Sequence, residues 1–353
     1  MDYIAWRGDL KFSDSEFTEV DALIFTQLSY IDFSGIVSSD MRECVTLKEA
    51  SRLFFKEGQK PLGAVLPEDI TSLLKAAASS ERFKDVKLSG FIDRVDDENE
   101  EQFSALLFHI GRDVFAAYRG TDDTIVGWKE DFNLSYMDSV PSQREAADYL
   151  NKAMRTFWFS KFYAGGHSKG GNLSVYAAAN LEPKYKRRIK RVFNFDGPGF
   201  PEKPVKSREY EEISGKVINI LPEGSIIGRL FEACGEERIV SCKENLILQH
   251  VAFGWEVLGS SFVAADGPSG SSVAVDRVLS GWISEMTKEE REILVEAIFE
   301  VFKASEAKTL TDIINDKLGF MKAIGTVDKD KKRDIRKYMA KILEQAAKYM
   351  IKN

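Results

Sequence analysis

The residues most able to do chemistry lie in the stretch GGHSKGG, where Ser168 stands between Gly166 and Gly170. This stretch follows an apolar run typical of a buried strand and precedes an alanine-rich run with helical spacing. A G-x-S-x-G motif between a strand and a helix is the pattern of a nucleophile elbow. The turn is so tight that side chains two residues before or after the serine would collide with the strand or the helix, which accounts for the glycines. We therefore predict that Ser168 is a nucleophile above a sheet; the alternative is a structural glycine-rich turn.

A serine nucleophile needs a general base, and the chain has three histidines. His167 is covalently next to the serine, and in such a turn neighbouring side chains are expected to point away from each other. His109 precedes the serine on an expected core strand, where a structural histidine is the more common state. His250, in LILQHVAFGW, follows the last strand signals, and hydrolases with this turn place the histidine after the serine and the acid. We predict that His250 is the base; the alternative is a surface-loop histidine.

Two carboxylates compete for the third catalytic position. Asp196 ends the strand-like run RVFNF and opens the turn DGPGF, where it would fix the histidine tautomer and stabilise the imidazolium. Glu223 follows the next strand-like run, in ILPEGSIIG, where many hydrolases of this architecture carry their acid. We favour Asp196 because the Gly-Pro-Gly after it fixes the backbone, and Glu223 remains the alternative acid. For each, the structural alternative is a turn-capping or solvated carboxylate.

Two backbone N–H groups are expected to stabilise an oxyanion beside the serine. The first belongs to Lys169, which opens the helix after the nucleophile. The second should come from a loop after an early strand, and the stretch AAYRGTDDTIVGWKEDF fits because a strand-like run ends just before Arg119. Thr121 would donate both its N–H and its hydroxyl. A structural alternative is an ion pair between Arg119 and Asp131, and both interpretations can hold together.

The elements that must position these residues indicate an α/β protein. Three β-rich runs, Leu88–Val95, Gln102–Ile110 and Asp113–Tyr118, indicate an antiparallel edge. Later strand-like runs alternate with helical ones, which indicates a mostly parallel sheet flanked by helices on both faces. The start of the chain reads as a helical preamble, and its end is almost wholly helical in pattern. We expect a core with its preamble at residues 1–270 and a C-terminal helical region at 271–353.

Composition and charge limit the partners. The chain has 353 residues, 44% of them hydrophobic, and a formal charge of −7, which argues against nucleic acid as the main partner. We expect a small-molecule or lipid acyl substrate. The three cysteines lack metal-ligand spacing and read as reduced thiols, and no cluster of ligand residues implies a metal or an organic cofactor. With no signal-like start and no run of about 18 apolar residues, we expect a cytoplasmic protein.

Two segments outside the expected sheet are open to more than one interpretation. Gly197–Gly215 is polar, contains prolines and lies close to Asp196, which makes it a candidate lid. The basic amphipathic end at 331–353 could touch an anionic membrane. A helical cap packed on the core is the favoured interpretation of that end.

Three stretches, YRGTDDTIVGWKEDF, GGHSKGGN and QHVAFGW, resemble the class 3 (fungal-type) lipases of the α/β-hydrolase superfamily. A closer resemblance is to a family of bacterial, mostly Firmicute, α/β-hydrolase-like proteins, which the opening DYIAWRGDLKFSDSEFTEVDALIFTQLSY also resembles. The resemblance covers most of the chain before residue 260, and its most specific parts are the R-G-T-D loop and the G-x-S-x-G turn. It implies an α/β-hydrolase fold, Ser168 as nucleophile, His250 as base, and Thr121 with Lys169 as the oxyanion hole.

Two departures from the class 3 pattern bear on the site. Those lipases usually carry their aspartate where this chain has Ser225, whereas FDGPGF resembles the Leu-Asp-Pro context in which animal pancreatic-type lipases place their acid. This second resemblance supports Asp196. Lys169 stands where lipases usually have leucine or another apolar residue. Its side chain would suit an anionic or polar acyl substrate, or would lie along the helix and reach solvent.

Function has to be argued from the site, because one fold hosts many functions. We predict a serine hydrolase that cleaves an acyl ester or thioester through an acyl-enzyme at Ser168, with proton transfer by His250. The alternative is a non-catalytic module on the same scaffold that binds a partner or a membrane, an interpretation favoured by the doubtful acid and the long helical tail. The intact serine, histidine and oxyanion loop favour the enzyme.

Overall fold

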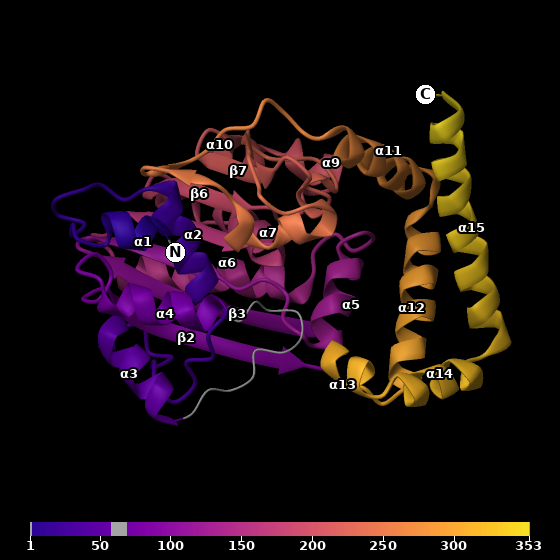
Figure 1. The fold of residues 1–353 in the computed structure, drawn as a ribbon, viewed down its shortest axis with the longest axis horizontal. Coiled ribbons are helices and arrows are strands. Elements are labelled where there is room, and N and C mark those ends of the chain that lie inside the picture. Colours follow the sequence, from indigo (N-terminus) through magenta and orange to yellow (C-terminus); the bar gives the residue numbers. More distant parts are fainter. Residues whose placement is uncertain (1, 58–68, 353) are drawn as a thin grey trace.

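An eight-stranded sheet forms the centre of the computed structural model, which describes residues 2–57 and 69–352 (Figure 1). Neighbouring strands are antiparallel from β1 to β4 and parallel from β4 to β8. The predicted antiparallel edge and mostly parallel sheet are therefore confirmed. In the order in which they lie in the sheet, the strands are β1 Val45–Thr46, β2 Lys87–Asp96, β3 Glu101–Ile110, β4 Asp113–Tyr118, β5 Phe162–His167, β6 Ile189–Phe195, β7 Val217–Pro222 and β8 Glu236–Val240.

Helices cover both faces of this sheet and enclose two hydrophobic cores. Side chains alternate between the faces along each strand, so on β4 Phe115 lies in the first core while Ala116 and Tyr118 lie in the second. Helices α1 to α4 contribute to the first core, and α6, α7 and α10 contribute to the second. The helices that precede β7 in the chain are α1 Asp2–Arg7, α2 Glu19–Leu28, α3 Leu47–Glu57, α4 Asp69–Ser79, α5 Ile125–Asn133, α6 Pro141–Thr156, α7 Lys169–Ala179, α8 Pro183–Lys186, α9 Glu202–Val205 and α10 Arg208–Ser214.

The helical N-terminal part is tied to the first core by a buried ion pair. Arg82, which follows α4, donates to both carboxylate oxygens of Asp21 on α2, at 2.7 and 2.6 Å, and both side chains are fully buried. The hydroxyl of Tyr3 on α1 donates to the same carboxylate at 2.9 Å. Because a buried charge is tolerated only when it is paired and hydrogen-bonded, this cluster fixes α1 and α2 to the segment after α4.

Short elements follow the last strand of the large sheet. The base predicted from the sequence, His250, ends a 3₁₀ turn at Leu246–His250, and a second turn at Ala252–Gly254 comes directly after it. A two-stranded hairpin then forms from β9, Val257–Leu258, and β10, Ser261–Phe262. A third 3₁₀ turn, Ile227–Arg229, lies earlier, between β7 and β8.

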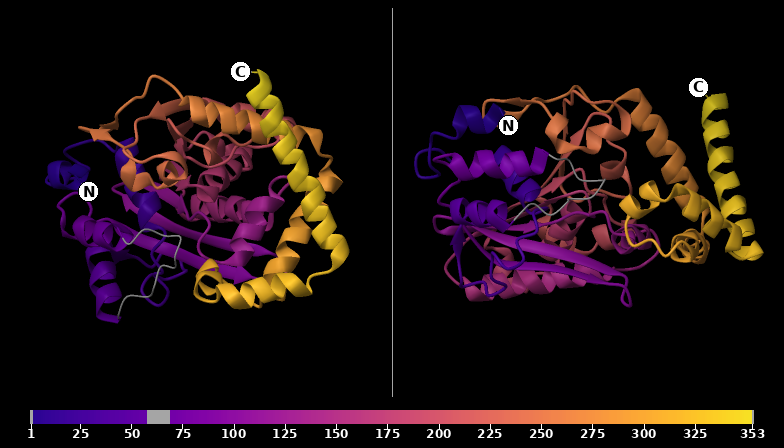
Figure 2. Two further views of the ribbon diagram at one scale, coloured as in Figure 1. Left: turned by 45° about the vertical axis from the view of Figure 1, so that its right-hand side comes forward. Right: turned by 60° about the horizontal axis from the view of Figure 1, so that its bottom comes forward.

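The chain ends in a helical region that stands beside the sheet, next to α5 (Figures 1 and 2). The helical region contacts the core through a short antiparallel pairing in which Thr124 faces Thr309. Next to this pair, Ile125 N–H donates to Lys308 O at 2.9 Å. In the part of the chain that the structure describes, no helix combines the length and apolar character needed to cross a membrane. Side chains at 339 and 342–353 lie outside the described residues, so the amphipathic character of this end stays a prediction. The helices are α11 Gly270–Glu285, α12 Lys288–Ala304, α13 Leu310–Asn315, α14 Lys317–Thr326 and α15 Lys329–Lys352.

Candidate active site

Ser168 lies at the tight turn between β5 and α7, with φ of 58° and ψ of −133°. The backbone is crowded there: a Cβ on Gly166 would lie 2.1 Å from the carbonyl carbon of Gly170, and a Cβ on Gly170 would lie 2.1 Å from Tyr118 O. No side chain fits at such distances, so both positions require glycine. The strained strand–turn–helix geometry that the motif predicts is therefore present.

Asp196 lies beside Ser168 because the two follow neighbouring parallel strands. His167 of β5 is in register with Phe195 of β6, and Ser168 N–H donates to Phe195 O at 2.9 Å. The Asp196 side chain is fully buried, and its Oδ2 accepts a hydrogen bond from Nδ1 of His250 at 2.6 Å. Since Nδ1 carries the proton, Nε2 of His250 is left as the basic nitrogen.

Two more donors converge on the Asp196 carboxylate. Its Oδ1 accepts hydrogen bonds from the hydroxyl of Ser225 and, at 3.2 Å, from Gly228 N–H. Ser225, which follows β7, thus supports a carboxylate that comes from the preceding strand. Among the described residues, the carboxylate that contacts His250 is that of Asp196 and not that of Glu223.

The other two histidines differ in their surroundings. His109 on β3 is a structural histidine, as expected: its Nε2 lies 2.8 Å from the hydroxyl of Ser89, and burial lowers its pKa to about 4. The His167 side chain lies against the loop that carries His250, a contact that the sequence did not predict. Its Nε2 donates to His250 O at 2.8 Å, the two rings lie 4.7 Å apart, and its Nδ1 accepts from the Tyr30 hydroxyl at 3.3 Å.

Burial, and secondarily the proximity of His250, lowers the pKa of His167 to about 3, so this ring is neutral at physiological pH. A neutral imidazole with its proton on Nε2 can serve as donor to His250 O and acceptor from Tyr30 at once. His167 therefore helps to hold the backbone at His250 in place. The sequence spacing does not indicate this contact, because His250 is 83 residues away from His167 along the chain and comes close only in the fold.

The loop after β4 lies directly against the serine. A Cβ on Gly120 would be 3.2 Å from Ser168 Cβ, so the residue directly before Thr121 lies beside Ser168. The Thr121 hydroxyl donates to Oδ2 of Asp131 at 2.5 Å, so its proton is committed to that carboxylate, and the backbone N–H is the donor left for an oxyanion. The described hydrogen bonds do not include one between Ser168 Oγ and His250, a contact that in many apo sites tightens only with substrate.

The expected ion pair between Arg119 and Asp131 is not formed. Arg119 is buried and instead donates to both carboxylate oxygens of Asp93 on β2, at 2.8 and 2.7 Å, and to Asp122 at 3.0 Å. A bidentate pair across the antiparallel edge holds the start of the loop more firmly than a single contact would. Arg119 meets Asp93 because β2, β3 and β4 pair side by side in the sheet, and the spacing of residues in the sequence does not reveal this pairing.

Asp131 carries a carboxylate with one buried oxygen, Oδ1, that has no hydrogen-bond partner among the described residues. Burial raises the pKa of Asp131 to about 6, against the lowering effects of the nearby Lys169 and of the hydrogen bond from Thr121. The Asp131 carboxyl, which accepts the hydrogen bond from the Thr121 hydroxyl, therefore gains or loses its proton close to neutral pH.

The Lys169 side chain is 1% exposed and points inward, so it neither reaches solvent nor stands ready for an anionic substrate, and both sequence-based interpretations were wrong. Its Nζ donates to Oε2 of Glu130 on α5 at 2.9 Å, and to the backbone and side-chain oxygens of Gln102 on β3 at 2.9 and 2.8 Å. Glu130, also fully buried, accepts in addition from Gln102 N–H and Ser142 N–H, at 3.1 and 2.8 Å. All three ammonium protons are thereby satisfied.

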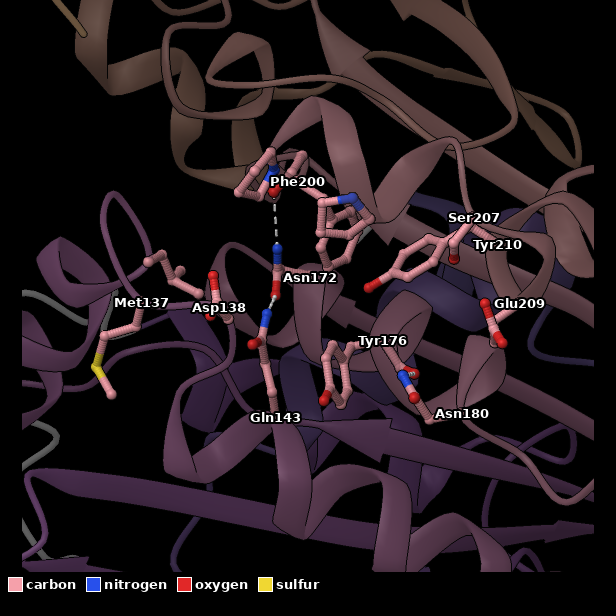
Figure 3. Close-up of a pocket in the computed structure, with 14 residues that line it drawn as sticks. Met137, Asp138, Gln143, Asn172, Tyr176, Asn180, Phe200, Ser207, Glu209 and Tyr210 are labelled. Atoms are coloured by element: carbon pink, nitrogen blue, oxygen red, sulfur yellow. Dashed lines mark hydrogen bonds between the residues drawn. The ribbon is translucent and has the colours of Figure 1, made fainter. Parts of the chain in front are cut away.

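A cavity of about 200 Å³ lies beside α7, under the segment that was the candidate lid (Figure 3). Gln143 donates to Oδ1 of Asn172 at 2.8 Å, and Asn172 donates to the carbonyls of Pro198 and Gly199 at 3.1 and 2.9 Å. These bonds hold the beginning of Gly197–Gly215 against α7. The segment is packed on the body of the protein in this structure.

The strand order, the helices on both faces and the turn at Ser168 define a lipase-like protein of the α/β-hydrolase fold. The chain belongs to the Mbeg1-like family, whose model matches residues 77–300. No curated protein matches the chain in sequence. Among the described residues, no group of three or more histidine, cysteine or carboxylate side chains is arranged to hold a metal ion.

Solved structures of lipases are similar to this chain at low identity. The mono- and diacylglycerol lipase from Aspergillus oryzae is 13% identical, over 75% of this chain and 94% of its own, with a TM-score of 0.44. The M37 lipase is 16% identical, over 61% of this chain and 70% of its own, with a TM-score of 0.39. The Rhizomucor miehei lipase in its propeptide complex is 14% identical, over 63% and 68%, with a TM-score of 0.39.

Removing the Lys169 ammonium should destabilise the fold strongly. Lys169→Met leaves the Glu130 carboxylate buried without its cation, and we expect a loss of about 3–5 kcal/mol in the free energy of unfolding. The double variant Lys169→Met/Glu130→Gln should be more stable than Lys169→Met alone, because the carboxylate that lost its cation is removed as well. Urea unfolding at pH 7 measures both. Lys206→Met, which breaks an exposed pair with Glu202, is the control and should cost less than about 1 kcal/mol.

Asp131→Asn should change how stability depends on pH. The folded-state pKa of Asp131, about 6, lies above its ordinary value of 3.8, so its contribution to stability is present below pH 4 and is lost as the pH rises through 6. The asparagine keeps an acceptor for the Thr121 hydroxyl but carries no charge. We expect the melting temperature of the variant, relative to the wild type, to rise between pH 4 and pH 8. A difference that stays constant over this range would contradict the assignment.

Proposed function

We propose that this protein is a serine hydrolase that cleaves an acyl ester or thioester, with Ser168 as nucleophile, His250 as general base and Asp196 as the acid that orients the base. The observation that carries the proposal is the 2.6 Å hydrogen bond between Asp196 and His250 at the end of the strand next to Ser168. A buried carboxylate bound to Nδ1 leaves Nε2 basic, which is what proton abstraction from a serine requires.

The reaction would run in two halves. His250 Nε2 takes the hydroxyl proton as Ser168 Oγ bonds to the acyl carbon, and the imidazolium returns this proton to the departing alcohol or thiol. The acyl-enzyme is then hydrolysed when a water molecule gives a proton to His250 and its oxygen bonds to the acyl carbon. The carboxylic acid leaves as Ser168 regains its proton.

The oxyanion of each tetrahedral state would lie between two backbone donors, the N–H groups of Lys169 and Thr121. Lys169 opens α7, so its N–H is among those that a helix start leaves unpaired. The ion pair between the Lys169 side chain and Glu130 connects α7 to α5, the helix that follows Thr121. Preorganised donors of this kind cost no reorganisation when the charge develops.

The substrate would be recognised through its acyl group and not through a negative charge. The cation next to the nucleophile is already paired with Glu130 inside the protein, so it offers no site for an anionic head. A small-molecule or lipid ester with a neutral acyl chain is therefore the substrate class that we propose.

A fluorophosphonate probe tests the activated serine directly. We expect the purified protein to be labelled, and Ser168→Ala and His250→Ala to lose the label. Asp196→Asn should slow labelling by about three to four orders of magnitude, because the histidine would take the wrong tautomer. Glu223→Gln is the matched control and should label like the wild type.

Absence of labelling in a folded wild-type protein would contradict the proposal and favour a non-catalytic module on the same scaffold. Loss of labelling in Glu223→Gln with full labelling in Asp196→Asn would reverse the assignment of the acid. Circular dichroism and unfolding curves of each variant show whether a loss of label reflects chemistry or misfolding.

His167 should act as a positioning residue. His167→Leu removes the donor to His250 O, and we expect kcat for a soluble ester to fall by about 100-fold with little change in KM, because the base is displaced and not the acyl site. His167→Gln can place an amide donor near the same carbonyl and should recover part of kcat. Equal losses in both variants would show that the ring contributes only packing.

A further inference from the structure

An exposed aromatic pair lies at the edge of the large sheet from which the parallel strands begin. Trp158 and Phe159, in the turn between α6 and β5, are 56% and 97% exposed, and we call them the aromatic tip. Single apolar side chains on a protein surface are common, but two adjacent large rings in water form an apolar projection that does nothing for the isolated fold. Such a projection is typical of a surface that meets an apolar partner.

Arg188, which directly precedes β6, holds the backbone of this turn. Its Nη1 donates to Met154 O at 2.8 Å, and its Nη2 donates to Phe157 O. Its Nε and Nη2 also donate to Ser160 O, at 2.9 and 2.7 Å. These carbonyls lie at and after the end of α6, where a helix leaves its last carbonyl groups without internal partners. Phe157 packs against the second core while Phe159 stays outside, so the aromatic tip belongs to an ordered turn.

Positive charge is concentrated next to the aromatic tip. The segments 152–161 and 182–191 together contain nine lysine and arginine residues and one acid, although the whole chain carries a formal charge of −7. The single acid, Glu182, already pairs with Arg155 and Lys184, at 3.1 and 2.7 Å. The positive charge of these segments therefore exceeds what their own acid can neutralise.

Three exposed cations share this edge of the sheet with the aromatic tip, and we call them the basic edge: Arg112, Lys161 and Arg187. They come just before β4, β5 and β6, whose beginnings lie side by side in parallel pairing. The Trp158 ring lies 6.1 Å from the ring of Tyr185, two residues before Arg187. Among the described residues, the side chains of Lys161 and Arg187 make no hydrogen bond or ion pair, so their charges face solvent.

The acids that flank the basic edge are engaged. Asp113 pairs with Lys190 at 2.5 Å, and Glu212 of α10 pairs with Lys186 at 2.8 Å. Their charges are neutralised locally, so the edge keeps a positive field towards solvent.

We propose that the aromatic tip and the basic edge dock this protein onto the surface of an anionic lipid layer. Tryptophan is enriched where a membrane meets water, and lysine and arginine next to an anionic leaflet strengthen the attraction. A ring that is 97% exposed, as that of Phe159 is, has no wall beside it against which a base or a peptide side chain is held. It can, however, insert into a lipid layer as it stands. Outside the two basic segments the chain is acidic, so repulsion turns the other faces away from the layer.

Docking through this edge directs Ser168 away from the lipid. Lys161 directly precedes β5 and Ser168 directly follows it, and the six residues of this strand span about 20 Å. Substrate would then reach Ser168 from the water above the layer. This consequence rests on the proposed function, whereas the docking itself does not.

Co-sedimentation of the full-length chain with vesicles tests the docking. Vesicles of phosphatidylcholine with about 30% phosphatidylserine present an anionic surface, and vesicles of phosphatidylcholine alone are the comparison. We expect binding to the anionic vesicles and binding to the neutral ones that is about tenfold weaker or more. Binding should also weaken as the salt concentration is raised, because the attraction between exposed charges is screened.

Two double variants each remove one half of the docking surface. Lys161→Gln/Arg187→Gln should weaken binding to anionic vesicles about 30-fold, because two attractions to the leaflet are lost. Trp158→Ser/Phe159→Ser should weaken it about tenfold, because less apolar area leaves water. All four side chains are exposed, so the melting temperatures should stay close to that of the wild type.

Tryptophan fluorescence locates the aromatic tip in the lipid. Anionic vesicles should shift the emission of the wild type to shorter wavelength, as Trp158 leaves water. Trp158→Phe should still sediment with the vesicles but lose this shift. Trp6→Phe removes a tryptophan of similar exposure, 50%, and should keep it.

Lys329→Gln/Arg336→Gln, on exposed positions of α15, is the control matched in charge and should bind like the wild type. The proposal is overturned if the wild type does not bind anionic vesicles. It is also overturned if this control weakens binding while Lys161→Gln/Arg187→Gln does not, which would assign the contact to the basic end of the chain. Binding to single-stranded DNA without binding to vesicles would overturn it as well. The assay uses no substrate, so its outcome is separate from labelling at Ser168.

Discussion

The buried ion pair between Lys169 and Glu130 is the interaction on which the arrangement of the candidate site depends. It joins the helix that begins after Ser168 to the helix that follows Thr121, and its hydrogen bonds also reach β3 through Gln102 and the start of α6 through Ser142. Four elements thus meet at one pair of charges. A buried pair of this kind adds little net stability compared with apolar packing, but it enforces one geometry, because any displacement leaves a charge unpaired.

The Asp196 carboxylate is likewise held by several hydrogen-bond donors. The carboxylate follows β6, and Ser225, which follows β7, donates to it. The carboxylate and its donor thus come from neighbouring parallel strands. Parallel strands end at a common edge of the sheet, so side chains that follow neighbouring strands can meet there.

Local patterns allowed much of this to be predicted. The mostly parallel sheet with its antiparallel edge follows from periodicity and is confirmed, and the tight turn that the motif at Ser168 predicts is present in the structure. The inward course of Lys169 and the contact between His167 and His250 could not be predicted, because each depends on a residue brought close only by the fold.

The pairing of Thr124 with Thr309 joins the C-terminal helices to the loop after β4. Thr124 lies three residues after Thr121, and the backbone bond from Leu310 to Asp123 O, at 2.9 Å, joins the same loop to the far end of the chain. The boundary at residue 270 stays a prediction. The position of the loop that carries Thr121 is fixed in part by backbone hydrogen bonds with Lys308 and Leu310, which lie far along the chain from the strands of the large sheet.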